Sequence, residues 1–160
     1  KILSKKDVSK NYVNWMNDKE ITKFTEQRNF NHKKKDIENF IHLKLRSVDE
    51  FLFGIFYLNK HVGNIKLGPI NQKEKSAEVS FLIGEKSLWG KGITTVSLLT
   101  IIKFGISLGL QKICAGYYEM NTGSEKVFKK CGFKVTRVLK HENNPQIYSK
   151  SIMVEYLTDL

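Results

Sequence analysis

Two segments in the first third of the chain carry apolar side chains at intervals of three or four residues. In residues 7–18 these are Val8, Tyr12, Trp15 and Met16, and in residues 32–47 they are Ile37, Phe40, Ile41 and Leu45. This spacing puts them on one side of a helix, whose opposite side is polar. The pattern therefore predicts two amphipathic helices joined by a long polar loop.

The period of the pattern then changes to two. Residues 50–59, 60–70 and 76–84 alternate in the way that half-buried strands do, with a hairpin turn at Asn59-Lys60. In the third strand one face carries Ala77, Val79, Phe81 and Ile83, and the other carries Glu78, Ser80 and Leu82. These segments predict a three-stranded antiparallel meander.

The second half of the chain alternates helices with strands. A helix that ends near Leu108 is apolar around most of its circumference, so we expect it to be largely buried. Strands are predicted at 111–119, 133–141 and 146–157, the last two flanking the turn "ENNP". Between the strands 111–119 and 133–141 lies a short helix within 121–133. Thr122 to Glu125 fits a capping box at its start, and Gly132 fits the position after its last turn.

This order predicts an α/β fold, an α+β mixed sheet with helices on both faces. The chain contains two prolines and no repeat or low-complexity segment, so residues 1–160 are expected to form a single domain. No apolar run reaches the ~20 residues of a membrane span, and residues 1–10 lack the apolar centre of a signal peptide. Cys114 and Cys131 form no CxxC and have no histidine cluster beside them, which favours reduced thiols, no metal site and a cytoplasmic location.

The net charge of +11 raises the question of a nucleic-acid partner. Of the 27 basic residues only Arg28, Arg46 and Arg137 are arginines, whose planar guanidinium is suited to bases and phosphates. The lysines are dispersed, with one run at 32–36. We therefore expect no specific nucleic acid and no membrane as partner, but a positive field that attracts anionic ligands.

The stretch "SLWGKGITTVSLL" (87–99) places Gly90 and Gly92 between a strand and a helix. The third glycine of the dinucleotide fingerprint and the spacing of a Walker A loop are both absent. A helix start nevertheless offers unpaired N–H groups, and glycines let the backbone approach an oxyanion closely. The stretch is therefore either a pyrophosphate-binding loop or a structural turn, and its context favours the former.

With these residues the chain resembles the GNAT superfamily of acetyl-CoA-dependent N-acetyltransferases. The superfamily signature Arg/Gln-x-x-Gly-x-Gly/Ala reads Ser87-Leu-Trp-Gly90-Lys-Gly92 here, with serine in the first position. A second signature is matched by Asn121, Ser124 and "KKCGF" (129–133). The branch is that of ribosomal-protein, spermidine and sugar acetyltransferases. The resemblance implies a GNAT-like fold with a central, mostly antiparallel, splayed sheet, and acetyl-CoA as cofactor with coenzyme A as product.

The resemblance also implies how the cofactor is held. The pantetheine arm is expected beside strand 76–84, where that strand and strand 111–119 splay apart, and the pyrophosphate at 90–94. The expected cofactor-binding residues are Leu82, Ile83, Gly90, Lys91, Gly92, Ile93, Thr94, Asn121, Phe128 and Lys130. Asn121 could equally be a helix cap. Lys126, Lys129 and Lys130 could meet the ribose phosphate or be solvated.

Transfer of an acetyl group to an amine requires a base for the ammonium proton and a proton for the departing thiolate. We expect Glu78 to be the base, with Glu119 as the second candidate. Many GNAT enzymes use a tyrosine four residues before the Gly-Phe pair as the acid, but that position is Phe128 here. Ser124 or water is the expected proton donor.

The acceptor is expected to be a primary amine on a small molecule, most specifically a nucleotide-linked amino sugar, because the positive charge disfavours a polyamine. Glu26 and Arg28, in the loop between the first two helices, are the expected substrate contacts. A protein N-terminus is the alternative acceptor. A non-catalytic basic binding module on the same fold is the alternative class, since Ser87 and Phe128 depart from the family pattern. A monomer or a homodimer would be compatible with the sequence.

Overall fold

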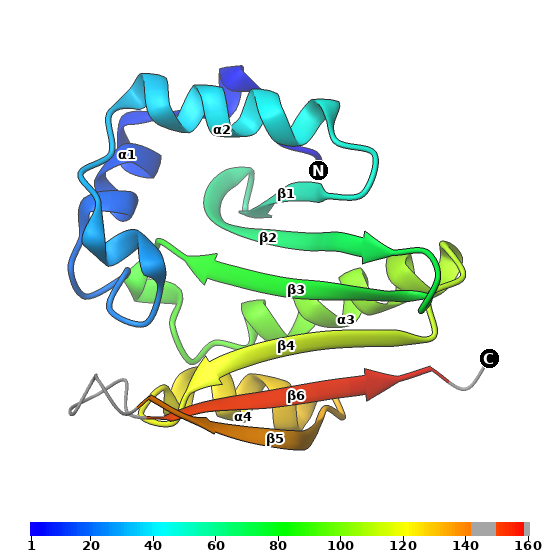
Figure 1. Cartoon of the computed structure of the whole chain (residues 1–160). Coiled ribbons are helices and arrows are strands. Elements are labelled where there is room, and N and C mark those ends of the chain that lie inside the picture. The colour runs from blue at the N-terminus through cyan, green and yellow to red at the C-terminus, as the bar shows by residue number, and fades with distance from the viewer. Residues whose placement is uncertain (142–149, 159–160) are drawn as a thin grey trace. The chain divides into compact units, whose positions relative to one another are not determined.

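The computed structural model of the chain describes residues 1–141 and 150–158 (Figure 1). Its helices are α1 (Lys10–Asn17), α2 (Lys34–Arg46), α3 (Ile93–Ser107) and α4 (Thr122–Lys130). Its strands are β1 (Phe51–Tyr57), β2 (Lys60–Asn71), β3 (Ser76–Ile83), β4 (Lys112–Tyr118), β5 (Lys134–Lys140) and β6 (Lys150–Leu157). The six strands form one mostly antiparallel sheet in the order β1-β2-β3-β4-β6-β5, which confirms the predicted fold class. The predicted "ENNP" turn lies outside the described residues.

The chain forms two compact units, each made of two segments. The first contains Lys1–Gly68 and Ser80–Lys91, and the second contains Pro69–Val79 and the described residues from Gly92 onward. Strands β2 and β3 each contribute residues to both units. The boundary between the units therefore runs through strands and not through a linker.

In the first unit the two predicted helices form a core with the start of the chain. Helix α1 begins after Ser9, whose Oγ accepts a hydrogen bond from the N–H of Tyr12 (3.2 Å). Helix α2 packs against β1 and buries Ile37 and Ile41. Phe40 and Leu45 were expected on the same buried face, but they are 42% and 48% exposed. They lie at the flanks of the apolar stripe, because each residue turns the helix by about 100°.

A two-residue turn joins β1 and β2. Tyr57 pairs with Lys60, so the turn residues are Leu58 (φ 47°) and Asn59 (φ 62°), one position earlier than predicted. Positive φ at both central residues gives the turn the twist that a tight hairpin needs. Asparagine adopts this conformation readily, whereas leucine rarely does, which is why the sequence indicates the turn at Asn59 but not at Leu58.

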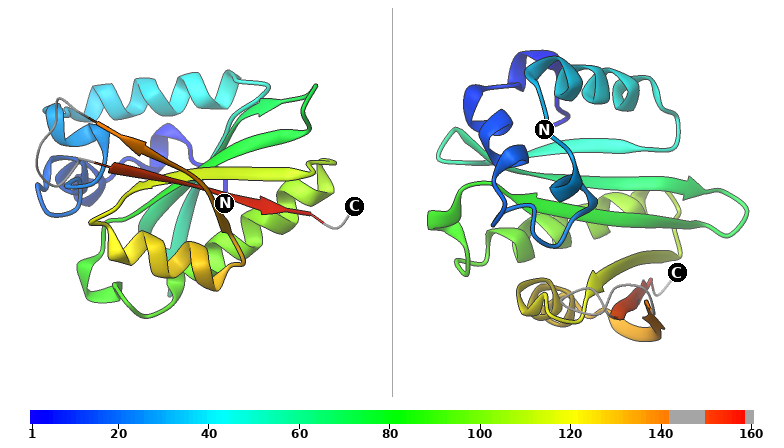
Figure 2. Two further views of the ribbon diagram at one scale, coloured as in Figure 1. Left: turned by 60° about the horizontal axis from the view of Figure 1, so that its bottom comes forward. Right: turned by 60° about the vertical axis from the view of Figure 1, so that its left-hand side comes forward.

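In the second unit β4 pairs with β6, and β6 with the edge strand β5, all antiparallel (Figure 2). Helix α3 packs against β4 where Gly105 meets Ile113: an added Cβ would lie 3.0 Å from the Ile113 Cδ1 atom. The prediction that this helix is largely buried is wrong for its outer side, where Val96 and Leu99 are 66% and 41% exposed. Only one side of the helix packs, and an apolar side chain on the other side meets solvent.

The parallel pairing of β3 with β4 is short. It joins Ser76 to Lys112, Ala77 to Ile113 and Glu78 to Cys114, and the ladder ends there. Strand β3 continues to Ile83 and β4 to Tyr118. The pairing is thus confined to the part of β3 that belongs to the second unit.

Candidate functional site

The glycine loop adopts a backbone that glycine alone accepts easily. Gly90 has φ +75° and Gly92 has φ +79°, both left-handed. A Cβ built on either glycine would meet nothing within 4 Å, so the backbone conformation and not crowding requires glycine. Gly90 and Lys91 end the second segment of the first unit, and Gly92 begins the second segment of the second unit.

The start of α3 lacks the usual side-chain cap. Gly92 is its N-cap residue and can supply no side-chain acceptor, and the first turn contains no acidic residue. The first N–H groups of the helix, from Ile93 and Thr94 onward, therefore face no carboxylate or hydroxyl at the cap position. This is the arrangement by which helix N-termini bind anions, through N–H groups and the positive end of the helix dipole.

The turn before Gly90 is fixed by its own side chains. Ser87 Oγ donates to Glu85 Oε1 (2.8 Å), and this Glu85 oxygen also accepts from the Ser87 N–H (3.4 Å). The Trp89 indole N–H donates to the carbonyl oxygen of Ile83 (3.0 Å). Ser87, which replaces the Arg or Gln of the GNAT signature, thus stabilises the turn between β3 and the glycine loop.

The backbone of Ile83 points away from β2. Gly84 N–H donates to the Val62 carbonyl (2.9 Å), and a Cβ on Gly63 would lie 2.5 Å from the Leu82 oxygen. Because backbone groups alternate in direction along a strand, the C=O of Ile83 projects from the opposite edge, where Trp89 reaches it. Sequence reasoning selected Leu82 and Ile83 but missed Trp89, whose place directly before Gly90 was the available signal.

The two candidate bases lie at different ends of β4. Glu78 is exposed and pairs with Cys114 in the β3–β4 ladder. Burial raises the pKa of the Cys114 thiol, and the charges of Glu155 and Glu78 raise it further. Glu119 follows the other end of β4 and forms an ion pair with Lys150 (3.2 Å). Five residues of strand span about 16 Å, so the two carboxylates are not brought together.

Asn121 caps α4. Its Oδ1 accepts a hydrogen bond from the Ser124 N–H (3.1 Å), which confirms the capping alternative. The predicted capping box began at Thr122 and is one residue too late, because both residues are able to cap and the sequence does not rank them. Gly132, with φ +86°, follows the last turn as predicted. Ser124 lies half-buried in the first turn, and Lys126, Lys129 and Lys130 are exposed.

Phe128, which stands where many GNAT enzymes have tyrosine, is a core residue only 3% exposed. Its ring is stacked with that of Tyr117 on β4, with centroids 5.8 Å apart, and also contacts Phe133. Burial, and then the charge of Glu125, raise the pKa of Tyr117. The phenol that Phe128 lacks is therefore present on its neighbour, which sequence reasoning missed because the contact is between distant segments.

Arg28 and Glu26 lie in a short 3-10 turn, Glu26–Asn29, of the first unit. Arg28 Nη1 donates to the Thr25 carbonyl (2.6 Å) and to Glu26 Oε1 (3.3 Å), and the Arg28 side chain is 16% exposed. The Glu26 side chain is 66% exposed. Arg28 thus holds the loop together, and the side chain of its partner Glu26 is largely exposed.

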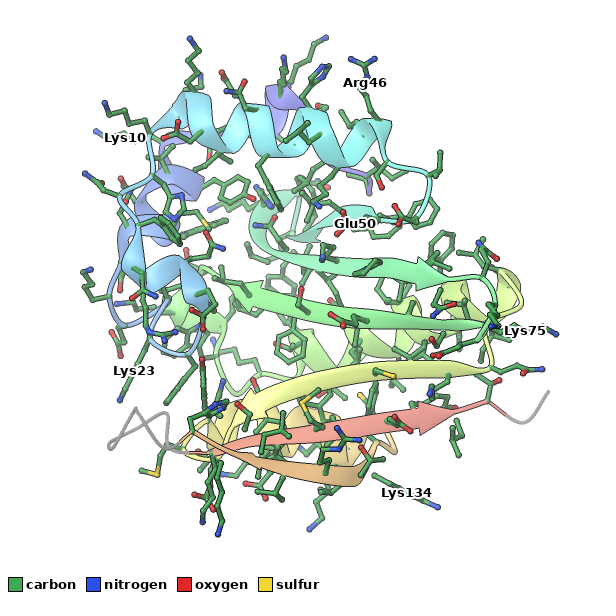
Figure 3. All side chains as sticks on the ribbon, viewed as in Figure 1. Lys10, Lys23, Arg46, Glu50, Lys75 and Lys134 are labelled. Atoms are coloured by element: carbon green, nitrogen blue, oxygen red, sulfur yellow. The ribbon has the colours of Figure 1, made fainter. Side chains whose placement is uncertain are left out.

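The basic side chains are dispersed, as the sequence suggested. In the first unit Lys10, Lys23 and Arg46 point outward, and in the second unit Lys75 and Lys134 do so (Figure 3). Among residues 1–141 and 150–158, no three His, Cys, Asp or Glu side chains are grouped to hold a metal ion. No helix in that part of the chain is long and apolar enough to cross a membrane.

A comparison with protein families places these features in context. The family described as "Acetyltransferase (GNAT) domain" matches residues 3–134. The chain belongs to this GNAT family. An uncharacterised protein of Methanocaldococcus jannaschii is 33% identical over 93 residues, which are 58% of this chain and 18% of that protein. The GNAT chain thus matches less than a fifth of the length of this curated relative.

Solved structures share the fold. A ribosomal-protein alpha-N-acetyltransferase in complex with coenzyme A has a TM-score of 0.88 at 14% identity (99% of this chain, 93% of that one). A spermidine N-acetyltransferase from Vibrio cholerae with CoA and spermine has 0.84 at 20% (98% and 93%). A microcin self-immunity acetyltransferase with acetyl-CoA and AMP has 0.83 at 20% (97% and 89%). At these identities the likeness establishes the GNAT fold, as the resemblance implied.

Proposed function

We propose that this chain is an acetyl-CoA-dependent N-acetyltransferase that transfers acetyl directly to a primary amine. The observation that carries the proposal is the pair Gly90 and Gly92, both left-handed, directly before a helix whose N-cap has no side chain, in a chain of the GNAT family. Proteins of this fold have been solved with CoA or acetyl-CoA, which supports the same cofactor here.

The proposed cofactor contacts follow the chain. The backbone of β3 at Leu82 and Ile83 would pair with the amides of the pantetheine arm, and residues Gly90 to Thr94 would bind the pyrophosphate through N–H groups. Lys91 and Lys130, both exposed, would add positive charge. Asn121 uses its oxygen to cap α4, which leaves its amide nitrogen to donate to the cofactor. Phe128 would contribute an apolar wall and no proton.

We propose Glu78 as the general base. Its carboxylate is exposed on β3, and the β3–β4 ladder ends at this residue. Glu119, the other candidate, already has a cationic partner, since its Oε1 lies 3.2 Å from the Lys150 ammonium nitrogen. The base removes a proton from the ammonium group, so that the neutral amine can attack the thioester carbonyl.

The departing thiolate needs a proton, and two hydroxyl groups of the second unit are suited to supply it. Ser124 lies in the first turn of α4, half-buried. Tyr117 has a phenol beside Phe128, and its raised pKa keeps it protonated near neutral pH. Tyr117 supplements the serine that the sequence suggested, because it restores an aromatic hydroxyl beside the substituted position.

For the acceptor we propose an amine on an anionic small molecule, most specifically a nucleotide-linked amino sugar. The net charge of +11 attracts anions and opposes a polyamine. Glu26 and Arg28 would contact this acceptor, Glu26 directly and Arg28 by holding the loop. A protein N-terminus is the alternative acceptor. A cytoplasmic location, inferred from the free thiols of Cys114 and Cys131, belongs to the same proposal.

Two measurements test the proposal. Calorimetry with acetyl-CoA should give a micromolar affinity, whereas duplex DNA should bind weakly and lose binding as salt is raised. A thiol-release assay across nucleotide amino sugars, polyamines, aminoglycosides and N-terminal peptides should show turnover on a sugar nucleotide. Strong DNA binding without acetyl-CoA binding would favour the non-catalytic basic module. Turnover of peptides alone would move the acceptor to a protein N-terminus.

A further inference from the structure

The indole of Trp89 bridges the two elements of the first unit that the proposed function assigns to the cofactor. Its N–H donates to the Ile83 carbonyl at 3.0 Å, and the next residue along the chain is Gly90. Ile83 belongs to the strand that would pair with the pantetheine arm, and Gly90 to the loop that would bind the pyrophosphate. The ring is 43% exposed, so burial of the side chain does not account for its position.

The segment between these two residues is closed by hydrogen bonds. Leu88 N–H donates to the Glu85 carbonyl (3.0 Å), and Trp89 N–H donates to that of Lys86 (3.1 Å). Lys91 N–H donates to the Leu88 carbonyl (3.3 Å), which carries the turn into the glycine loop. The indole bond is the one contact among these that returns directly to the strand, and it therefore sets the distance from strand to loop.

The same turn is also fixed from outside. Lys86 Nζ lies 2.9 Å from Asp18 Oδ2 and 2.5 Å from Glu20 Oε2, both in the segment that follows α1. These ion pairs hold the outer side of the turn and the indole bond holds its inner side. Loss of the indole N–H would therefore leave the turn folded but free to shift against Ile83.

We propose that Trp89 is a positioning residue that fixes the strand of Ile83 and the loop of Gly90 in the spacing at which one acetyl-CoA molecule binds both. This inference rests on the proposed function. A ligand held at two linked places gains affinity only when its geometry allows both contacts at once. Trp89 therefore contributes to the affinity for the whole cofactor and not to the affinity for either part of it.

The test compares CoA with 3′,5′-ADP, which contains the 3′-phosphate and the first of the two phosphates of the pyrophosphate but no pantetheine arm. Trp89→Phe keeps an aromatic ring and removes the N–H, and Trp89→Ala removes both. Both variants should bind CoA about threefold to tenfold more weakly, the effect of one hydrogen bond, with 3′,5′-ADP affinity unchanged within about twofold. Tyr57→Phe, which removes a polar group from a similarly exposed ring of β1 (46%), is the matched control and should change neither.

The outcomes separate this inference from the proposed function. If the parent chain binds CoA and Trp89→Phe binds it equally well, the positioning role is wrong and the proposed function stands. Equal loss of affinity for CoA and 3′,5′-ADP would also overturn the positioning role, because the variant would then have damaged the loop itself. If the parent chain binds neither ligand, the proposed function fails and this inference with it.

Discussion

The ring of Tyr117 lies on the ring of Phe128, with 5.8 Å between the centroids and 21° between the planes. One aromatic pair thus joins β4 to the residue that replaces the usual GNAT acid. In many GNAT enzymes the tyrosine that protonates the thiolate stands at the position of Phe128, whereas here the tyrosine is its neighbour Tyr117. A proton donor acts through the position of its O–H group, so a tyrosine on β4 can take the place of one on α4.

Replacement of Tyr117 by phenylalanine should slow turnover about tenfold to hundredfold without changing CoA affinity, since a proton donor is lost and the stacking is kept. The raised pKa of Tyr117 keeps the phenol protonated, so on its alkaline side the parent's rate should fall only at strongly alkaline pH, and that fall should vanish in Tyr117→Phe. Tyr118→Phe, one residue along the same strand, is the control. Steady-state rates from pH 6 to 10.5 measure the effect; an unchanged rate would leave Ser124 or water as the donor.

Valine at Gly92 should abolish CoA binding. The added side chain would project into the open space above the loop, where the pyrophosphate is proposed to bind. Gly109 gives a matched control, since it also has φ +79° and open space around its Cβ position but lies after the end of α3. Both substitutions store similar backbone strain of about 1–2 kcal/mol. Calorimetry with CoA should show binding by Gly109→Val alone, and binding by both would refute the loop assignment.

Glutamine at Glu78 should lower turnover by about 10²–10⁴, the usual effect of losing a general base. Glu119→Gln is the comparison and should lose little. The reverse result, with Glu119→Gln impaired and Glu78→Gln normal, would reassign the base.

His61 should make the fold less stable as the pH falls below about 6.5, its unfolded value. Burial lowers its pKa more than the contacts of its Nε2 with Asn64 Oδ1 (2.8 Å) and the Gly63 carbonyl raise it. The unfolded chain therefore takes up the proton first, and stability is complete above pH 6.5 and declines below it.

Calorimetric unfolding between pH 7.5 and 4.5 measures this decline, which should lower the Tm by about 2–4 °C for each kcal/mol lost. His61→Gln should show a flatter dependence, whereas His42→Gln, on the exposed side of α2, should match the parent. Identical slopes for the two histidine variants would exclude His61 as the source.

Asp7 contributes to stability in a different pH range. Burial raises its pKa, but hydrogen bonds from Lys1 and Ser4 bring the pKa down to about 2, so the stability that Asp7 contributes is lost only below about pH 4.

The elements of the fold were predictable because each has a regular pattern of apolar positions, and α1, α2 and β3 all lie within the predicted ranges. Their details depend on choices that local sequence leaves open. Asn121 and Thr122 can both cap a helix, and only the structure shows that Asn121 does so. The exposed Val96 and Leu99 show that an apolar residue does not specify burial.

The candidate site was predictable to a different degree. Gly90 and Gly92 were selected from the sequence because glycine lets the backbone approach an oxyanion closely at a helix start, and the structure adds that both have left-handed φ. The bond from Trp89 to Ile83 and the stacking of Tyr117 on Phe128 were not readable, since neither involves a residue pattern. The roles of Glu78, Glu119, Glu26 and Arg28 stay predictions, because they depend on where a substrate lies.

Strand β5 lies at the edge of the sheet and is exposed along all of its length. An open edge of this kind could add a strand from another molecule, and a row of such additions would lead to fibrils. Lys134, Arg137 and Lys140 place a cation at every third position of this edge. Two copies brought together along it in antiparallel register would oppose like charges, so this spacing of cations disfavours pairing of two copies through their open edges.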